Sequence, residues 1–127
     1  MNKKFLVDTD IIISHLTTQT DESSDLVYLM QNGICFTTVI NAVELLKAAE
    51  GEAHLEVIRN ILNAFKVLGL NSRYALKVPD IKSFTKNNRD ILFLIVAKSN
   101  NLPIITYDKS KYNVPGIDIF NPSEIGG

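Results

Sequence analysis

Two short apolar runs, each ending in an aspartate, constrain the fold of this chain more than any other feature. Leu6–Asp10 reads LVDTD, and Ile104–Asp108 reads IITYD. Short apolar runs bounded by polar residues are typical of buried strands. A carboxylate at the end of such a strand is costly unless a cation or hydrogen-bond donors compensate it. We therefore expect compensating groups close to Asp8 and Asp108.

Helical patterns alternate with the apolar runs along the chain. Strands are predicted at 4–7, 35–37, 66–68, 103–106 and 117–119. Helices are predicted after Asp10, over 21–32, from Thr38 to near Gly51, over 55–65 and over 91–97, with Asp10, Thr38 and Asn88 as N-caps. No shape is predicted for 72–86, because Pro79 interrupts a helical composition. The alternation indicates one three-layer α/β/α domain over 1–127, with a central parallel sheet of four to five strands.

The composition is that of a soluble globular protein. Apolar residues make up 46% of the chain and charged residues 21%. There is no apolar run of the roughly 20 residues that span a bilayer, so no membrane association is expected. The single cysteine, Cys35, excludes an internal disulfide and is typical of the reducing cytoplasm, which is the location we expect.

The charge is distributed unevenly. The net charge is −1, which argues against tight, sequence-independent binding of nucleic acid. Residues 1–63 carry 4 basic and 9 acidic side chains, whereas 64–127 carry 9 basic and 5 acidic ones. If a metal ion neutralises Asp90 and Asp108, the segment Arg73–Lys111 becomes a surface that attracts phosphate. The alternative is an ordinary solvated helix face.

Two further carboxylates lie within helical patterns. Glu44 belongs to NAVELL, and Asp90 opens the apolar run in RDILFLIVA. Taken alone, Glu44 could face solvent, and Asp90 could be an acid that favours a helix start. Because ligands of parallel sheets bind at the carboxyl ends of the strands, Asp8 and Asp108 are expected at one such edge. The four acids together predict a site for a divalent metal ion.

Carboxylate oxygens favour hard cations, so we expect one or two Mg²⁺ or Mn²⁺ ions rather than zinc. A pair of such ions is suited to in-line displacement at phosphorus. The Thr9 and Thr106 hydroxyls could orient ligands or water nearby. His15 and His54 do not form a ligand-spaced pair, and no GxSxG motif or glycine-rich phosphate loop is present. Cys35 is interpreted as a small buried hydrophobe.

These motifs, in this order, resemble the PIN-domain nucleases, particularly the VapC-type toxins of prokaryotic toxin–antitoxin pairs. Asp8-Thr9-Asp10 resembles the segment that ends the family's first strand. Glu44 precedes an apolar pair, Asp90 starts an apolar helix, and Thr106-Tyr107-Asp108 resembles the Thr-x-Asp of a later strand. The ending VPGIDIFNP is similar to the family's closing strand. The resemblance covers nearly the whole chain.

The resemblance implies a Mg²⁺-dependent endoribonuclease that acts on RNA, forms a homodimer and is inhibited by an antitoxin protein inserting a peptide near the acidic site. It implies that Asp8, Glu44, Asp90 and Asp108 are the catalytic and metal-binding residues. Contacts with substrate are expected from Thr9, Thr106, Arg89, Lys109 and Lys111. Two positions depart from the family pattern. Asp10 replaces the usual Asn or Ser, and Ser110 stands where many members carry a further acid.

Two other functions are compatible with the sequence. VDTDIII also resembles the haloacid-dehalogenase-type phosphatases, in which Asp8 would be the nucleophile and Asp10 an acid or base. Those enzymes need further motifs and usually a longer core. Alternatively, the chain is a non-catalytic PIN-like module that binds RNA or protein, a reading supported by Ser110.

Overall fold

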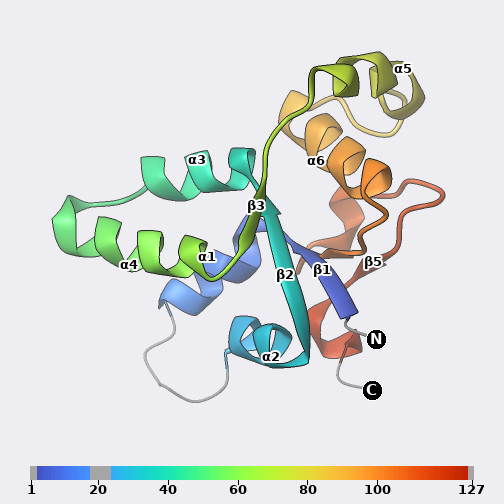
Figure 1. The fold of residues 1–127 in the computed structure, drawn as a ribbon. Helices are drawn as coiled ribbons and strands as arrows, with labels where there is room; N and C mark the ends of the chain where they lie inside the picture. Colours follow the sequence, from blue (N-terminus) through green and yellow to red (C-terminus); the bar gives the residue numbers. More distant parts are fainter. Residues whose placement is uncertain (1–2, 18–23, 126–127) are drawn as a thin grey trace.

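The centre of the protein is a parallel sheet. The computed structural model describes residues 3–17 and 24–125. Its five strands are arranged in the order β3-β2-β1-β4-β5, and all pairings are parallel (Figure 1). The strands are β1 (Lys3–Val7), β2 (Gly33–Thr38), β3 (Lys66–Leu68), β4 (Ile104–Ile105) and β5 (Ile119–Phe120). β3 has the predicted bounds, whereas the last strand begins two residues later than expected.

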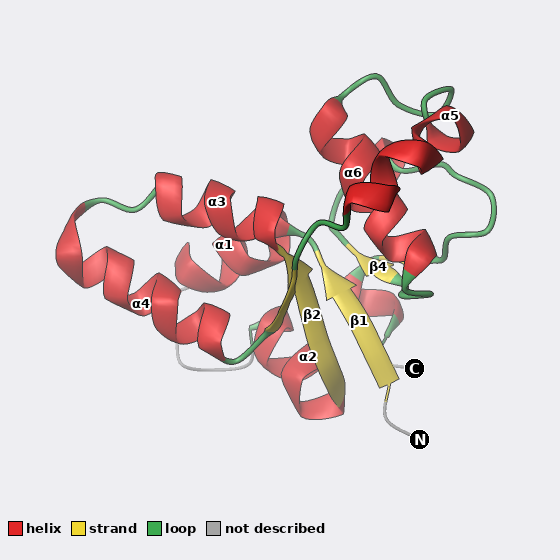
Figure 2. Cartoon of the chain, turned by 45° about the horizontal axis from the view of Figure 1, so that its top comes forward, coloured by secondary structure: helices red, strands yellow, loops and turns green. Residues whose placement is uncertain are grey.

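Helices cover both faces of the sheet, which confirms the predicted three-layer α/β/α class (Figure 2). One layer holds α1 (Thr9–Thr17), α2 (Asp25–Asn32), α3 (Val39–Lys47) and α4 (Gly51–Asn63). The other holds α5 (Val78–Ile81) and α6 (Asn88–Ser99), preceded by the 3₁₀ helix η1 (Ser72–Lys77). Two short 3₁₀ helices, η2 (Lys109–Lys111) and η3 (Pro122–Glu124), follow β4 and β5. Within the described ranges, no helix has the length and apolar character needed to cross a membrane.

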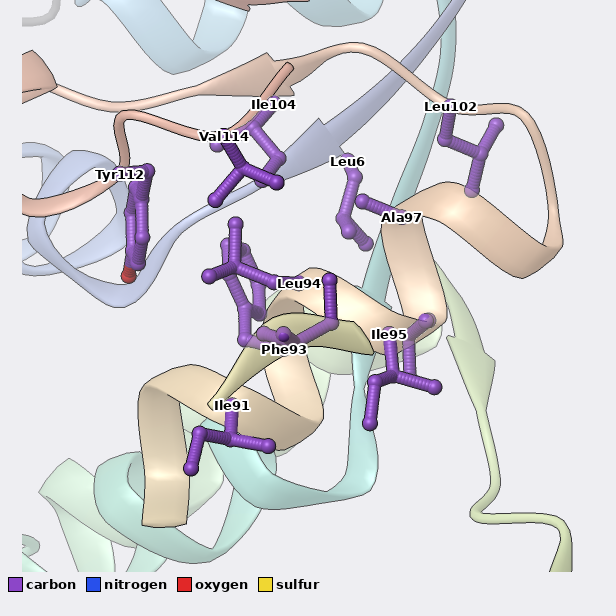
Figure 3. Packing of buried hydrophobic residues seen from close by; sticks show 12 residues of the cluster. Leu6, Ile91, Phe93, Leu94, Ile95, Ala97, Leu102, Ile104, Tyr112 and Val114 are labelled. Atoms are coloured by element: carbon purple, nitrogen blue, oxygen red, sulfur yellow. The ribbon is translucent and has the colours of Figure 1, made fainter. Parts of the chain in front are cut away.

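The strands β1, β2, β4 and β5 each contribute to both cores, because successive side chains of a strand point to opposite faces. Phe5 and Val7 of β1 pack among the helices α1 to α4, whereas Leu6 between them packs against α6. Figure 3 shows this second core, with Leu6 and Ile104 facing Leu94 and Phe93 of α6. An all-apolar strand is therefore the pattern expected for a sheet that is covered on both sides.

The helix N-caps explain how several functional residues are placed. Thr38 caps α3 as predicted, accepting hydrogen bonds from the backbone N–H groups of Ile40 and Asn41. The prediction for Asp10 is wrong, because α1 begins at Thr9 and Asp10 lies within its first turn. For α6 the cap is Asn87 and not Asn88. The error at α6 arises because Asn87 and Asn88 offer the same kind of oxygen at adjacent positions.

The remaining differences concern helix bounds. The described part of the helix predicted at 21–32 begins at Asp25, with Ser24 as its cap, and the predicted start at Asp21 lies outside the described residues. Pro79 falls in the first turn of α5. A proline is tolerated there because its missing N–H has no partner within the helix. Pro79 therefore helps to start a helix in the segment whose shape the sequence did not predict.

Candidate active site

The site lies where the central strands end. β1 ends at Val7 and β4 at Ile105, so Asp8 and Thr106 follow directly on adjacent strands. The Asp8 backbone N–H donates to the Ile105 carbonyl at 3.0 Å, which fixes the two chain segments to each other. The predicted location at the carboxyl edge of the sheet is therefore correct for Asp8.

Asp8 is completely buried and has hydrogen-bond donors around both carboxylate oxygens. Its Oδ1 accepts from the Thr9 backbone N–H at 2.8 Å and from Arg89 Nη2 at 2.6 Å. Its Oδ2 accepts from the Tyr112 hydroxyl at 2.7 Å and from Lys111 Nζ at 3.3 Å. These donors, two of them cationic, provide the compensation that the sequence led us to expect for a carboxylate at a strand end.

Arg89, in the first turn of α6, brings three of the four predicted carboxylates together. Its Nη2 lies 2.6 Å from Asp8 Oδ1 and 3.0 Å from Glu44 Oε1, and its Nη1 lies 3.1 Å from Asp90 Oδ1. Asp8, Glu44 and Asp90 come from the end of β1, from α3 and from α6. Residues that are far apart in the sequence thus surround one guanidinium group.

The charges of this cluster shift the pKa values of its members in a consistent direction. Burial by itself would raise the pKa of Asp8, but the charge and hydrogen bonds of Arg89, with help from Tyr112 and Lys111, lower it below its usual value. Burial would lower the pKa of Arg89, but Glu44 and Asp8 raise it. The pKa of the Tyr112 hydroxyl is raised by burial and by the adjacent Asp8 carboxylate. Asp8 and Arg89 are therefore an ion pair at neutral pH.

A small polar network positions Glu44. The Thr9 hydroxyl donates to Glu44 Oε1 at 2.7 Å and accepts from Asn41 Nδ2 at 2.8 Å. Asn41 is fully buried, and its Oδ1 in turn accepts from the Thr38 backbone N–H at 3.1 Å. The cap of α3 therefore also orients the Asn41 side chain, which reaches across to Thr9 at the start of α1.

Asp10 and Thr106 form a second part of the site. The Thr106 hydroxyl lies 3.1 Å from Asp8 Oδ2 and 3.0 Å from Asp10 Oδ2. A hydroxyl has one hydrogen and cannot donate to both carboxylates at once. Asp10 Oδ2 also accepts from the Tyr107 backbone N–H at 3.1 Å, whereas its Oδ1 is buried and has no hydrogen-bond partner among the described residues.

Asp108, the fourth predicted acid, is not among the carboxylates that pair with Arg89. It is exposed, and its carboxylate accepts a hydrogen bond from the Ser110 hydroxyl. Two basic residues that follow it are engaged within the chain. Lys109 Nζ lies 2.8 Å from Glu124 Oε1, and Lys111 pairs with Asp8. Arg89 and these lysines, which were expected to contact substrate, are all held by carboxylates of the chain itself.

The site can be tested against the divalent ion that the sequence predicts. The donor chemistry fits, because the gathered groups are carboxylate and hydroxyl oxygens, and Asp10 Oδ1 is a buried acceptor to which no described residue donates. In the present arrangement the carboxylates pair with the Arg89 guanidinium. Within 3–17 and 24–125, no three acidic, histidine or cysteine side chains are grouped closely enough to hold a metal. The oxygens suited to an ion are thus present, but they surround Arg89.

Two residues of the site were missed by the sequence analysis. Asn41 stands three residues after Thr38, where a capping-box partner is expected, and this spacing could have identified it. Tyr112 stands at the edge of the core that Figure 3 shows, 5.5 Å from the ring of Phe93, with its hydroxyl on Asp8. No local sequence signal distinguishes Tyr112 from an ordinary core aromatic.

Several solved structures share the fold of this chain. A chain of DNA-bound VapBC from Salmonella typhimurium is 20% identical, with a TM-score of 0.78, over 94% of this chain and 98% of that one. VapBC-1 from nontypeable Haemophilus influenzae is 18% identical, with a TM-score of 0.76, over 94% and 98%. FitAcB from Neisseria gonorrhoeae is 21% identical, with a TM-score of 0.73, over 94% and 98%. At these identities the likeness concerns the fold alone.

The family assignment rests on the sequence itself. No curated protein matches the chain. Residues 5–117 match the PIN domain family, and this range contains Asp8, Glu44, Asp90 and Asp108. The match covers far more than half of the chain. The PIN domain therefore replaces the haloacid-dehalogenase-type phosphatase as the interpretation of VDTDIII. The chain belongs to the PIN domain family.

Proposed function

We propose that the protein is a divalent-metal-dependent endoribonuclease that acts as the toxin of a toxin–antitoxin pair. The observation that carries the proposal is the convergence of Asp8, Glu44 and Asp90 on one cation. Membership of the PIN domain family supports a nuclease, and the fold shared with VapBC and FitAB chains supports the toxin role.

Asp8, Glu44 and Asp90 would hold Mg²⁺ or Mn²⁺, with Asp108 as the fourth predicted ligand. When bound, such an ion supplies an activated water and stabilises the departing oxygen of the phosphodiester. The residues of the chain have separate tasks. Thr9 orients Glu44 through its hydroxyl, and the Asp8 carboxylate is kept ionised by the basic groups around it. Thr106 and Asp10 can position a water beside Asp8.

The substrate and partners follow from the same proposal. The substrate is RNA, and the predicted contacts are Thr9, Thr106, Arg89, Lys109 and Lys111. One solved structure with this fold is a toxin–antitoxin complex from Klebsiella pneumoniae, and another describes VapBC as a family of toxin–antitoxin systems. Both support a cognate antitoxin as the partner of this chain. A homodimer remains a prediction from the family resemblance.

A second function is favoured by one specific observation. No close group of metal ligands is found in the described ranges, and Arg89 neutralises the carboxylates instead. A PIN-like module that binds RNA or a protein without cleavage would have these features. Cleavage assays distinguish this module from the nuclease.

The test is cleavage of 5′-labelled total cellular RNA in Mg²⁺ or Mn²⁺. Asp8→Asn, Glu44→Gln and Asp90→Asn are each expected to lower cleavage at least about a hundredfold, in line with the loss of a charge-stabilising group from a catalytic site. Glu56→Gln is the matched control, because Glu56 is exposed on α4 and its ion pair among the described residues is with Arg59. Equal cleavage by wild type and Asp8→Asn, or none by either, would count against the nuclease.

A further inference from the structure

Arg89 occupies the centre of the acidic site with an unusually complete set of contacts. Besides its three carboxylate partners, its Nη1 lies 2.5 Å from the Tyr112 hydroxyl and its Nη2 lies 3.3 Å from Thr9 Oγ1. Its guanidinium carbon lies 5.0 Å from the centre of the Phe93 ring, close enough for a cation–π interaction. The side chain is only 19% exposed.

These contacts use the oxygens that a metal ion would need. Asp8 Oδ1 and Glu44 Oε1 both accept from Arg89 Nη2, and Asp90 Oδ1 accepts from Nη1. A divalent ion placed among the three carboxylates would lie within a few ångströms of the guanidinium. Two cations that close repel each other strongly, more so at a partly buried site than in water. Arg89 and the ion therefore cannot share the present arrangement.

The guanidinium cannot avoid this repulsion by losing its proton. Arginine stays protonated in proteins, so the only way to remove the charge from the site is to move the side chain. Arg89 lies in the first turn of α6, at the end of the helix that follows the largely exposed segment 82–87, and its side chain is not fully enclosed. A change of rotamer can therefore carry the guanidinium away from the acids without unfolding the helix.

We propose that Arg89 is a built-in competitor of the catalytic metal ion, so that the ion binds only when the guanidinium leaves the Asp8–Glu44–Asp90 cluster. The inference rests on the proposed function, because it takes these carboxylates to be the metal ligands. While Arg89 contacts the Asp8–Glu44–Asp90 cluster, the chain neutralises its own acidic site and stays folded without metal. The apparent affinity for the ion is reduced by the fraction of molecules in which Arg89 has moved out.

The same geometry predicts how binding of RNA affects binding of the metal ion. Once released, Arg89 is a cation at the mouth of a site that would hold a phosphodiester, and a guanidinium binds phosphate oxygens well. Its predicted contact with RNA and its observed contact with the acids are then two positions of one side chain. Binding of RNA phosphate would draw Arg89 out and favour entry of the ion.

The experiment measures Mn²⁺ binding directly, from the loss of the free-ion signal in electron paramagnetic resonance. The proteins are the full-length wild type, Arg89→Gln and a control, Arg59→Gln, which changes an exposed arginine whose ion pair, in the part of the chain that the structure describes, is with Glu56. Arg89→Gln is expected to bind Mn²⁺ about 5- to 150-fold more tightly than wild type, the usual range for coupled binding events. Arg59→Gln is expected to match wild type.

Thermal melting gives a second readout that does not depend on activity. Without metal, Arg89→Gln is expected to melt below wild type, because three carboxylates are left without their shared cation. Saturating Mn²⁺ is expected to raise its melting temperature more than that of wild type. If Arg89→Gln fails to fold, Arg89→Lys decides the question. It keeps one positive charge but loses the planar fork, so intermediate Mn²⁺ affinity supports the proposal and wild-type affinity overturns it.

The outcomes separate this inference from the proposed function. Equal or weaker Mn²⁺ binding by Arg89→Gln, with wild-type binding intact and abolished by Asp8→Asn, would overturn the competitor role alone and leave the metal site standing. If neither wild type nor Arg89→Gln binds Mn²⁺ above the level of Asp8→Asn, the metal-dependent nuclease is refuted together with the inference.

Discussion

The structure predicts that replacing Asp8 by asparagine destabilises the metal-free protein. A site made of acids that repel one another would gain stability when one acid is neutralised. Here the environment of Asp8 is positive instead, since Arg89 and Lys111 both donate to it. Asparagine has nearly the same shape but lacks the charge, and its amide group would face Lys111 or Arg89 as a second donor.

The magnitude follows from burial. Breaking a buried ion pair by removing one partner costs about 3–5 kcal/mol. Asp8 is 0% exposed, but Arg89 keeps Glu44 and Asp90 as partners, and Lys111 is 34% exposed. We therefore expect about 3 kcal/mol, the low end of the range. For a chain of this size that corresponds to a fall in melting temperature of roughly 10 °C.

The assay is urea unfolding in EDTA at several pH values, with Asp118→Asn as the control because Asp118 is exposed. The pKa of Asp8 is lowered in the folded state from a usual value of 3.8. Its contribution is therefore fully present above that value and is lost as the pH falls through the folded-state pKa. The difference between wild type and Asp8→Asn should stay constant from pH 7 to 5 and shrink only below about pH 4.

Two results would refute this reasoning. Unchanged or increased stability of Asp8→Asn at pH 7 would mean that repulsion among the carboxylates outweighs their attraction to Arg89. A difference that instead grows as the pH falls from 7 to 5 would mean that the pKa of Asp8 is raised by burial rather than lowered by its basic neighbours.

Three further predictions concern the frame of the site. Gly33→Ala should lower the free energy of unfolding in urea by about 3 kcal/mol, the upper end for overpacking. The reason is that a Cβ there would lie 2.6 Å from the Lys3 carbonyl oxygen and 2.7 Å from a ring carbon of Phe5. Wild-type stability of the variant would show that β1 and β2 are less closely paired. Burial raises the pKa of the Cys35 thiol to about 11, so native protein should react with a disulfide reagent far more slowly than unfolded protein at pH 8, and equal rates would place the thiol at the surface. Thr38→Ala should cost about 1–2 kcal/mol by loss of the α3 cap, which thermal melting measures, and a cost near zero would show that Asn41 replaces the cap.

The local sequence pattern was sufficient to predict the fold class, because apolar runs and helix caps depend on residues that are close together in the chain. The run Lys66–Leu68 was predicted with its observed bounds, and Thr38 was identified as the cap of α3. The cap of α6 was assigned to Asn88 instead of Asn87. Either asparagine can accept from the first turn, and only the surrounding packing decides which one does.

The site was less predictable, because its contacts join residues far apart in the chain. Arg89 was expected to contact substrate through its charge, but its partners Asp8 and Glu44 are 81 and 45 residues away. Tyr112 gave no signal at all, since a hydroxyl turned toward a buried carboxylate looks the same in sequence as any aromatic in a core.

The sequence by itself determined which chemistry is available: acids at strand ends and helix starts, in an order that fits one family and one sheet. Periodicity and capping are sufficient for that, because they depend on neighbours within a few residues. Only the tertiary structure decided how those charges are balanced. It placed Arg89 among Asp8, Glu44 and Asp90 and left Asp108 on the surface. The reason is that a buried carboxylate takes the nearest cation in space, and the parallel sheet brings that cation from the far half of the chain.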